Sequence, residues 1–142
     1  MNVQKYLQQI KVLDAKIKQK QQQYIKLKAA ASSAGAVRYD KEVVQTTRTG
    51  DRLEKLVLQY IELEQEINQE KFRLEQAKQT IINQIHSLND DRFINVLFKR
   101  YVEYKSYELI AVEMNYSFDY VKELHRKALD SFAAKHPTLS HL

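Results

Sequence analysis

The side chains that most often carry catalysis or hold metal ions are sparse in this chain. It contains no Cys, which excludes disulfides, thiolate metal sites and cysteine nucleophiles. No two of the four histidines have metal-binding spacing with a glutamate between them; they are His86, His125, His136 and His141. The adjacent carboxylates Asp90 and Asp91 are better explained as a helix cap than as an acid–base pair. We therefore expect no catalytic residue, no metal site and no cofactor, and we expect that the chain is not an enzyme.

The remaining chemistry is that of charged side chains, which are unevenly spread. The chain has 23 Lys and Arg against 18 Asp and Glu, a net charge of +5. Residues 1–49 hold ten bases and three acids, whereas residues 50–85 carry a net −2 and residues 86–142 are neutral. A strongly basic arm often binds a polyanion, either a nucleic acid or a membrane surface. A solvated face of Lys and Gln explains the same composition equally well.

The composition points to helices. Only 2 Gly and 1 Pro occur in 142 residues, which excludes glycine-rich dinucleotide-binding loops and P-loops and argues against a turn-rich all-β fold. The hydrophobic fraction of 44% and charged fraction of 29% are typical of a soluble folded domain. No run of apolar residues approaches the length of about eighteen that a membrane-spanning helix needs. The N-terminus also lacks the apolar segment of a signal peptide. We expect an all-α protein of the cytoplasm, with no membrane partner.

Two long segments show the 3-4 spacing of apolar residues that is typical of coiled coils. The first predicts a helix over residues 2–28, with the seam Val3, Tyr6, Ile10, Leu13, Ile17, Lys20, Tyr24 and Leu27. The second predicts a helix over about residues 51–87, with the seam Leu53, Leu56, Tyr60, Leu63, Ile67, Glu70, Leu74, Ala77 and Ile81. Neither helix can bury its stripe alone. We favour an antiparallel hairpin over residues 1–88, while a homodimer seam is the competing arrangement.

Residues 29–50 are expected to form a basic loop between these helices, because they contain both glycines and most of the small residues. A connection of this length is longer than helix pairs normally use, and such loops are commonly functional or disordered. Its bases Arg38, Lys41 and Arg48, with Tyr39 among them, could contact a partner. A disordered tether is the interpretation we favour.

Residues 89–135 carry the most specific pattern, a series of short helices with polar residues at their starts. Asn89 or Asp90 can cap the first helix, and Ser106 and Ser117 can cap the next two. Asn115 lies where a tight turn needs a left-handed residue. The apolar residues expected to turn inward are Phe93, Ile94, Leu97, Tyr101, Leu109, Ile110, Met114, Val121, Leu124, Ala128, Leu129 and Phe132. This arrangement predicts a helix-turn-helix domain, followed by a flexible tail over residues 136–142.

The same residues carry a resemblance to a known family. The shared elements are Arg100-Tyr101, Ser106, Ile110-Ala111, Ser117, Val121 and Lys127-Ala128-Leu129. Over about forty residues this stretch resembles region four of bacterial sigma factors. The whole layout is similar to late-gene activators of the ArpU/RinA type, encoded by phages and prophages of Gram-positive bacteria, in which a helical part precedes such a domain. Asn115-Tyr116 departs from that pattern, since relatives usually have a Gly in this turn.

The resemblance makes residues 118–132 a recognition helix. A step of 100° per residue places Asp119, Lys122, Glu123 and Arg126 opposite the buried Val121. Lys and Arg can pair with guanine, and Glu can accept from the cytosine amino group. The residues expected to contact DNA from this helix are Ser117, Asp119, Tyr120, Lys122, Glu123, Arg126 and Lys127, with Lys105, Ser106 and Tyr107 expected at the DNA backbone. Acids and bases cancel on this face, so we expect the domain alone to bind DNA weakly.

The resemblance implies two partners, double-stranded promoter or operator DNA and the host RNA polymerase; a homodimer is a further arrangement. The leading hypothesis is a transcription regulator that activates phage late genes in a bacterial host cell. The alternative is a coiled-coil interaction protein that binds RNA polymerase or another protein without reading DNA sequence. RNA binding through the Lys-rich arm is a third hypothesis, supported by composition alone.

Overall fold

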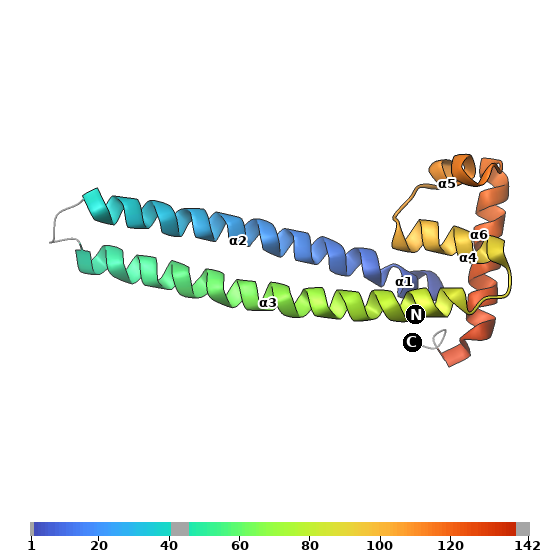
Figure 1. Ribbon diagram of the computed structural model, residues 1–142, viewed down its shortest axis with the longest axis horizontal. Coiled ribbons are helices and arrows are strands. Elements are labelled where there is room, and N and C mark those ends of the chain that lie inside the picture. The colour runs from blue at the N-terminus through green and yellow to red at the C-terminus, as the bar shows by residue number, and fades with distance from the viewer. Residues whose placement is uncertain (1, 41–45, 139–142) are drawn as a thin grey trace. The chain divides into compact units, whose positions relative to one another are not determined.

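The computed structural model of the chain describes residues 2–40 and 46–138 (Figure 1). Side chains are described over residues 2–33 and 50–138. All regular elements in these ranges are helical, so the described part of the fold is all-α. Two compact units can be distinguished. Unit 1 comprises the residues up to Leu13 and those from Leu74 onward, and unit 2 comprises Asp14–Arg73. This division differs from the predicted boundary at residue 88, because one end of each long helix packs with the C-terminal helices.

Unit 2 is built from parts of α2 (Gln9–Asp40) and α3 (Thr46–His86), which lie side by side (Figure 1). Both helices are longer than expected. The prediction of a loop over residues 29–50 is wrong for 29–40 and 46–50, which are helical, and residues 41–45 lie outside the described part of the chain. The physical reason is that Ala29–Ala31 favour the helix, and extending an existing helix avoids the cost of nucleation.

The predicted seams meet in unit 2. The rings of Tyr24 and Tyr60 are packed edge to face with centroids 5.8 Å apart. Lys20 Nζ lies 3.1 Å from Glu70 Oε1 and 3.6 Å from Glu66 Oε2. Later residues of α2 thus contact earlier residues of α3, so the two helices run in opposite directions.

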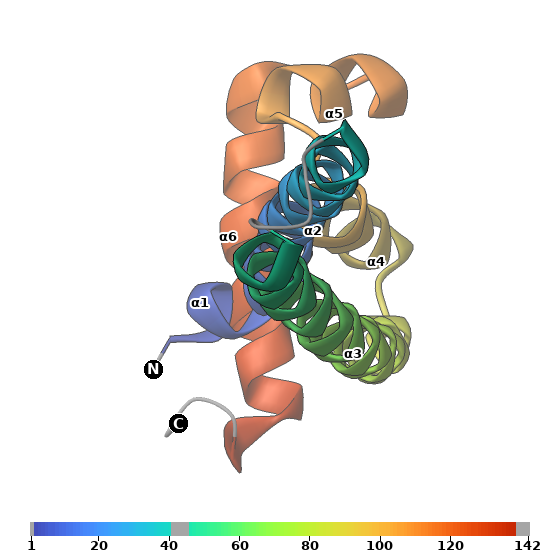
Figure 2. The same cartoon turned by 90° about the vertical axis from the view of Figure 1, so that its left-hand side faces the viewer.

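Unit 1 is organised around α6 (Phe118–Lys135), against which α1 (Val3–Leu7), α4 (Asp91–Leu97) and α5 (Tyr107–Met114) pack (Figure 2). The inward face of α6 has helical spacing, which gives it one apolar stripe. The buried apolar residues of this unit are Val3, Leu7, Ile10, Ile81, Ile85, Leu88, Val96, Leu97, Tyr101, Val102, Ile110, Ala111, Val121, Leu124, Ala128 and Phe132. They form one continuous core, which fixes how α5 and α6 are presented to solvent.

The predicted local signals at the helix ends are confirmed. The side chain of Asp90 accepts from the backbone N–H of Arg92 at 2.9 Å and caps α4. Ser106 and Ser117 cap α5 and α6, each accepting from the backbone N–H three residues on, at 3.2 and 3.1 Å. Asn115 has φ 60° and ψ 41°, the left-handed conformation that ends α5 and allows the chain to turn into α6.

Three details differ from the sequence predictions. Gln8 interrupts the first predicted helix between α1 and α2, and Leu7 is buried outside the predicted seam because α1 packs against α6. Leu109 was expected to turn inward but is 43% exposed. The third concerns the segment after α4, where the chain continues as a π-helical turn, η2 (Phe98–Val102).

The prediction of a flexible tail over residues 136–142 is wrong for its first residue, His136. His136 is half-buried at the C-terminal end of α6, where its ring packs on Phe132 with centroids 4.8 Å apart. Its Nε2 atom lies 3.2 Å from the hydroxyl of Ser87. These contacts hold His136 against the end of α3, whereas residues 139–142 lie outside the described range.

Candidate nucleic-acid interface

The outward face of α6 carries the side chains that were predicted to read DNA. Asp119, Lys122, Glu123, Arg126 and Lys127 are all exposed. The opposite face of the helix is buried in the core, because its apolar residues repeat at the helical period. The amphipathic pattern thus orients the polar face toward solvent.

Ion pairs along this face balance its charges. Lys127 Nζ lies 3.4 Å from Glu123 Oε1, and Arg126 Nη1 lies 3.7 Å from Asp130 Oδ2. All four side chains are more than half exposed, and each pair spans one helical turn. Exposed pairs of this kind contribute little to stability. The cations can therefore exchange their carboxylate partners for a phosphate or a base edge at little cost.

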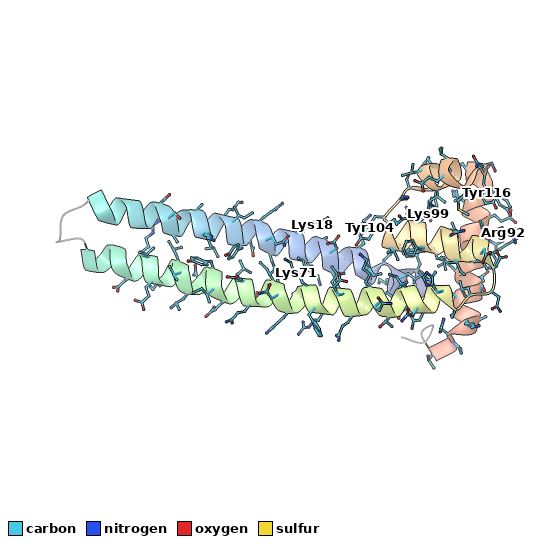
Figure 3. The ribbon with its side chains drawn as sticks, in the orientation of Figure 1. Lys18, Lys71, Arg92, Lys99, Tyr104 and Tyr116 are labelled. Atoms are coloured by element: carbon cyan, nitrogen blue, oxygen red, sulfur yellow. The ribbon has the colours of Figure 1, made fainter. Side chains whose placement is uncertain are left out.

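The N-terminal end of α6 is joined to the start of α4 through Arg92. Its Nη1 atom donates to the hydroxyl of Tyr120 at 2.7 Å, while its Nη2 atom donates to Asp90 Oδ2 at 2.9 Å. The hydrogen bond from Arg92 lowers the pKa of Asp90 below its ordinary value. The ring of Tyr120 packs edge to face on Tyr116 at 4.8 Å, and Figure 3 shows Arg92 and Tyr116 at this end of the unit.

Arg92 is not among the residues predicted to contact DNA, although its guanidinium hydrogen-bonds to the predicted contact residue Tyr120. The only local signal is its place two residues after the capping carboxylate Asp90. Nothing in the sequence indicates that its guanidinium reaches a hydroxyl 28 residues further along the chain.

The start of α5 holds the three residues predicted to contact the DNA backbone. Ser106 is exposed and caps the helix. Lys105 Nζ lies 2.8 Å from Glu113 Oε1, and Lys99 Nζ lies 2.7 Å from the same oxygen. The hydrogen bond between Lys105 and Glu113 raises the pKa of the lysine and lowers that of the carboxyl group. Lys105 and Lys99 are thus held in an ion-pair cluster around Glu113 of α5.

Tyr107 points into unit 1 and away from the α6 face. The guanidinium of Arg100 lies 4.3 Å from the centre of its ring. Its hydroxyl lies 3.5 Å from Nδ1 of the buried His125. The ring of Tyr107 also meets that of Phe118 at 6.5 Å, so the starts of α5 and α6 are brought together by an aromatic contact.

His125 occupies the buried side of α6 and has no exposed chemistry. Its Nε2 atom lies 2.6 Å from the hydroxyl of Tyr101. Burial, with a smaller effect of Arg100, lowers the pKa of His125 to about 4, and burial raises the pKa of Tyr101. In the described ranges no three His, Asp or Glu side chains are grouped to hold a metal ion. The histidine is a neutral core residue that hydrogen-bonds to its neighbours.

The structure therefore places the predicted contact residues in two groups. The first group lies on α6 and comprises Ser117, Asp119, Tyr120, Lys122, Glu123, Arg126 and Lys127. The second lies at the start of α5 and comprises Lys105, Ser106 and Tyr107. The capped ends of α5 and α6 present backbone N–H groups, which suit the binding of anions.

Comparisons of the chain with protein-family models, with curated proteins and with solved structures find no match. Across residues 2–40 and 46–138, no helix is both long and apolar enough to cross a lipid bilayer.

Proposed function

We propose that this chain is a DNA-binding transcription regulator that acts with RNA polymerase in the cytoplasm of a bacterial host. In this proposal residues 89–135 form a helix-turn-helix domain of the sigma-region-four type, and residues 1–88 form an antiparallel helical hairpin. The observation that supports it best is the pairing of two capped helices, α5 and α6, across the left-handed residue Asn115. This arrangement leaves one polar face of α6 exposed for the major groove.

The polar face of α6 has the donors and acceptors that base reading needs. Arg126 and Lys122 can donate to the O6 and N7 atoms of guanine, and Glu123 can accept from the amino group of cytosine. Ser106 and Ser117 lie at helix N-termini, where backbone N–H groups can meet phosphates. Arg92 is a further cation at this end of α6, hydrogen-bonded to Tyr120.

The domain is expected to bind DNA weakly by itself, and this is the reason for proposing that it acts together with RNA polymerase. Phosphate neutralisation supplies most non-specific affinity, and the ion pairs of α6 leave its face close to neutral. A larger DNA-bound partner would hold such a domain at its site. The resemblance to ArpU/RinA activators makes that partner the host polymerase, and it makes the regulated genes the late genes of a phage.

The experiment that tests this proposal measures binding of the full chain to DNA from upstream of its own gene, with and without RNA polymerase, across a salt series. Specific binding that strengthens with polymerase is expected. The substitutions K122A and R126A should each weaken specific binding by roughly tenfold. The matched control is K135A, which removes an exposed lysine from the last turn of the same helix. Equal losses in all three variants would contradict base reading by α6.

A second candidate function is that of a coiled-coil interaction protein. It is favoured by unit 2, where α3 exposes large apolar side chains at Leu58, Ile61 and Phe72, with exposed fractions of 54%, 41% and 64%. Exposed apolar side chains on a two-helix unit can bind another protein. In the same experiment this function predicts polymerase binding with no DNA sequence preference and no effect of K122A or R126A.

A further inference from the structure

Unit 1 has a small pocket away from the predicted base-reading residues of α6. It is lined by Gln8, Lys11, Arg100, Tyr101 and Tyr104. Its volume of about 40 Å³ accommodates about three water-sized groups, which is the scale of the oxygens of one phosphate. The lining offers amide, ammonium, guanidinium and phenol groups and contains no carboxylate. Such a lining favours an oxyanion.

The two cations of the pocket differ from the other cations near them. Lys99 and Lys105 share the carboxylate of Glu113 at 2.7 and 2.8 Å. Neither Lys11 nor Arg100 has a carboxylate partner within ion-pair distance in the part of the chain that the structure describes. Their charges are therefore available to a ligand.

The guanidinium of Arg100 is fixed in place before any ligand arrives. Its Nη1 atom donates to the backbone carbonyl of Lys105 at 3.0 Å, and its Cζ atom lies 4.3 Å from the centre of the Tyr107 ring. A guanidinium that is held in this way loses little conformational freedom on binding, and its remaining N–H groups form a fork that matches phosphate oxygens.

The backbone from Phe98 to Tyr104, which contains Arg100, has unusual geometry. Arg100 belongs to the π-helical turn η2, a form that is rare and often lies at functional sites. Tyr104, which Figure 3 shows in the segment leading from η2 to α5, has φ 61°. A left-handed tyrosine is strained and persists only where its surroundings impose that conformation. Both irregular segments contribute side chains to the pocket.

We propose that this pocket binds a phosphate group, with Lys11 and Arg100 as its charged ligands. The phosphate comes either from the DNA backbone or from a small phosphorylated molecule. The site does not depend on base reading by α6, so it stands if the proposed transcriptional role fails. If the source is DNA, the pocket adds a backbone contact from the basic N-terminal segment to those of α5 and α6.

The experiment is a titration of the ¹⁵N-labelled full chain with inorganic phosphate, at an ionic strength kept constant with chloride, followed by amide chemical shifts. The expected result is saturable shifts at Gln8, Lys11, Arg100 and Tyr104. K11Q should weaken binding by about tenfold, because it removes one charge-assisted hydrogen bond. R100K should also weaken binding, since a lysine keeps the charge but loses the planar fork.

The matched control is K5Q, which removes an exposed lysine from unit 1 outside the pocket and should leave phosphate affinity unchanged. Equal affinity of K11Q and the unsubstituted chain would overturn the proposal, as would shifts spread evenly over all lysines. A parallel titration with duplex DNA distinguishes the sources. If DNA supplies the phosphate, K11Q loses about one phosphate contact. The slope of log affinity against log salt concentration is then smaller by about 0.9 for K11Q than for K5Q. If a small molecule supplies the phosphate, K11Q weakens the binding of inorganic phosphate and leaves DNA binding and its salt dependence unchanged.

Discussion

The hydroxyl of Tyr101 lies 2.6 Å from Nε2 of His125, and this contact joins η2 to the buried face of α6. His125 is only 6% exposed, and its second ring nitrogen faces the hydroxyl of Tyr107 at 3.5 Å. The imidazole is thus buried beside two phenols, and the positive charge of Arg100 further disfavours its protonation. A proton added to this ring would have to be buried beside a cation.

Stability should therefore fall in mild acid. The pKa of His125 is about 4 in the folded chain and about 6.5 when unfolded, so between these values only the unfolded chain takes up the proton. The free energy of unfolding should be unaffected by this group above pH 6.5, decrease as the pH falls, and level off below pH 4. The total loss is about 3 kcal/mol. Urea unfolding of the full chain at pH 7, 6, 5 and 4.5 measures the part of this loss that falls above pH 4.5, about 2 kcal/mol.

The control is H125Q, which keeps a hydrogen-bonding side chain but removes the titration. It should be less stable than the unsubstituted chain at pH 7, and its stability should change less between pH 6.5 and 4.5. The lowered pKa of Asp90 makes its own contribution at lower pH, as that carboxylate is protonated. An H125Q variant with an unchanged pH slope would show that His125 does not cause the acid sensitivity.

The two polar residues of the predicted seams contact each other in unit 2. Lys20 Nζ lies 3.1 Å from Glu70 Oε1, and this hydrogen bond raises the pKa of Lys20 and lowers that of Glu70. A matched polar pair in an apolar seam can specify the register of two helices. We expect K20E and E70K each to lower the melting temperature, and the double reversal K20E/E70K to recover part of the loss. Recovery is partial because Glu66 also faces position 20 at 3.6 Å.

Circular dichroism melting of the full chain checks this prediction. The control is K18E, which makes the same charge change at a lysine whose side chain is 68% exposed and pairs with Asp14 in its own helix. K18E should change the melting temperature less than K20E does. Additive effects of K20E and E70K in the double variant would contradict a specific pair.

The N-caps should contribute measurably to the stability of unit 1. S106A and S117A each remove the side-chain acceptor of a backbone N–H at the start of α5 or α6. Each should lower the free energy of unfolding by about 1 kcal/mol. Urea unfolding provides the measurement, and S117D is the control because aspartate also caps helices. If S117A matched the unsubstituted chain while S117D differed from it, the capping role would be wrong.

The features that could be predicted from the sequence are those set by local chemistry. Ser106, Ser117 and Asn115 were placed correctly because a cap or a left-handed turn needs only a few neighbouring residues. The apolar stripe of α6 follows from its helical period in the same way. These signals were sufficient to predict the capped starts of α5 and α6 and the apolar face of α6.

The features that could not be predicted depend on contacts that are distant in sequence or on small energy differences. The contact between Arg92 and Tyr120 joins residues 28 positions apart. No residue type signals the π-helical turn that carries Arg100. Alanine-rich residues after position 28 can belong to a loop or to a helix, and here they extend α2 to Asp40.

The measurement that tests the central claim most directly is selection of bound duplexes from a random-sequence DNA pool by the full chain and by R126A and K135A, each in the presence of RNA polymerase and compared with polymerase alone. The proposed reading by α6 predicts an enriched motif in which one G·C position loses its preference in R126A while K135A keeps the motif intact. Absence of any enriched motif, or the same motif from R126A, would contradict the account.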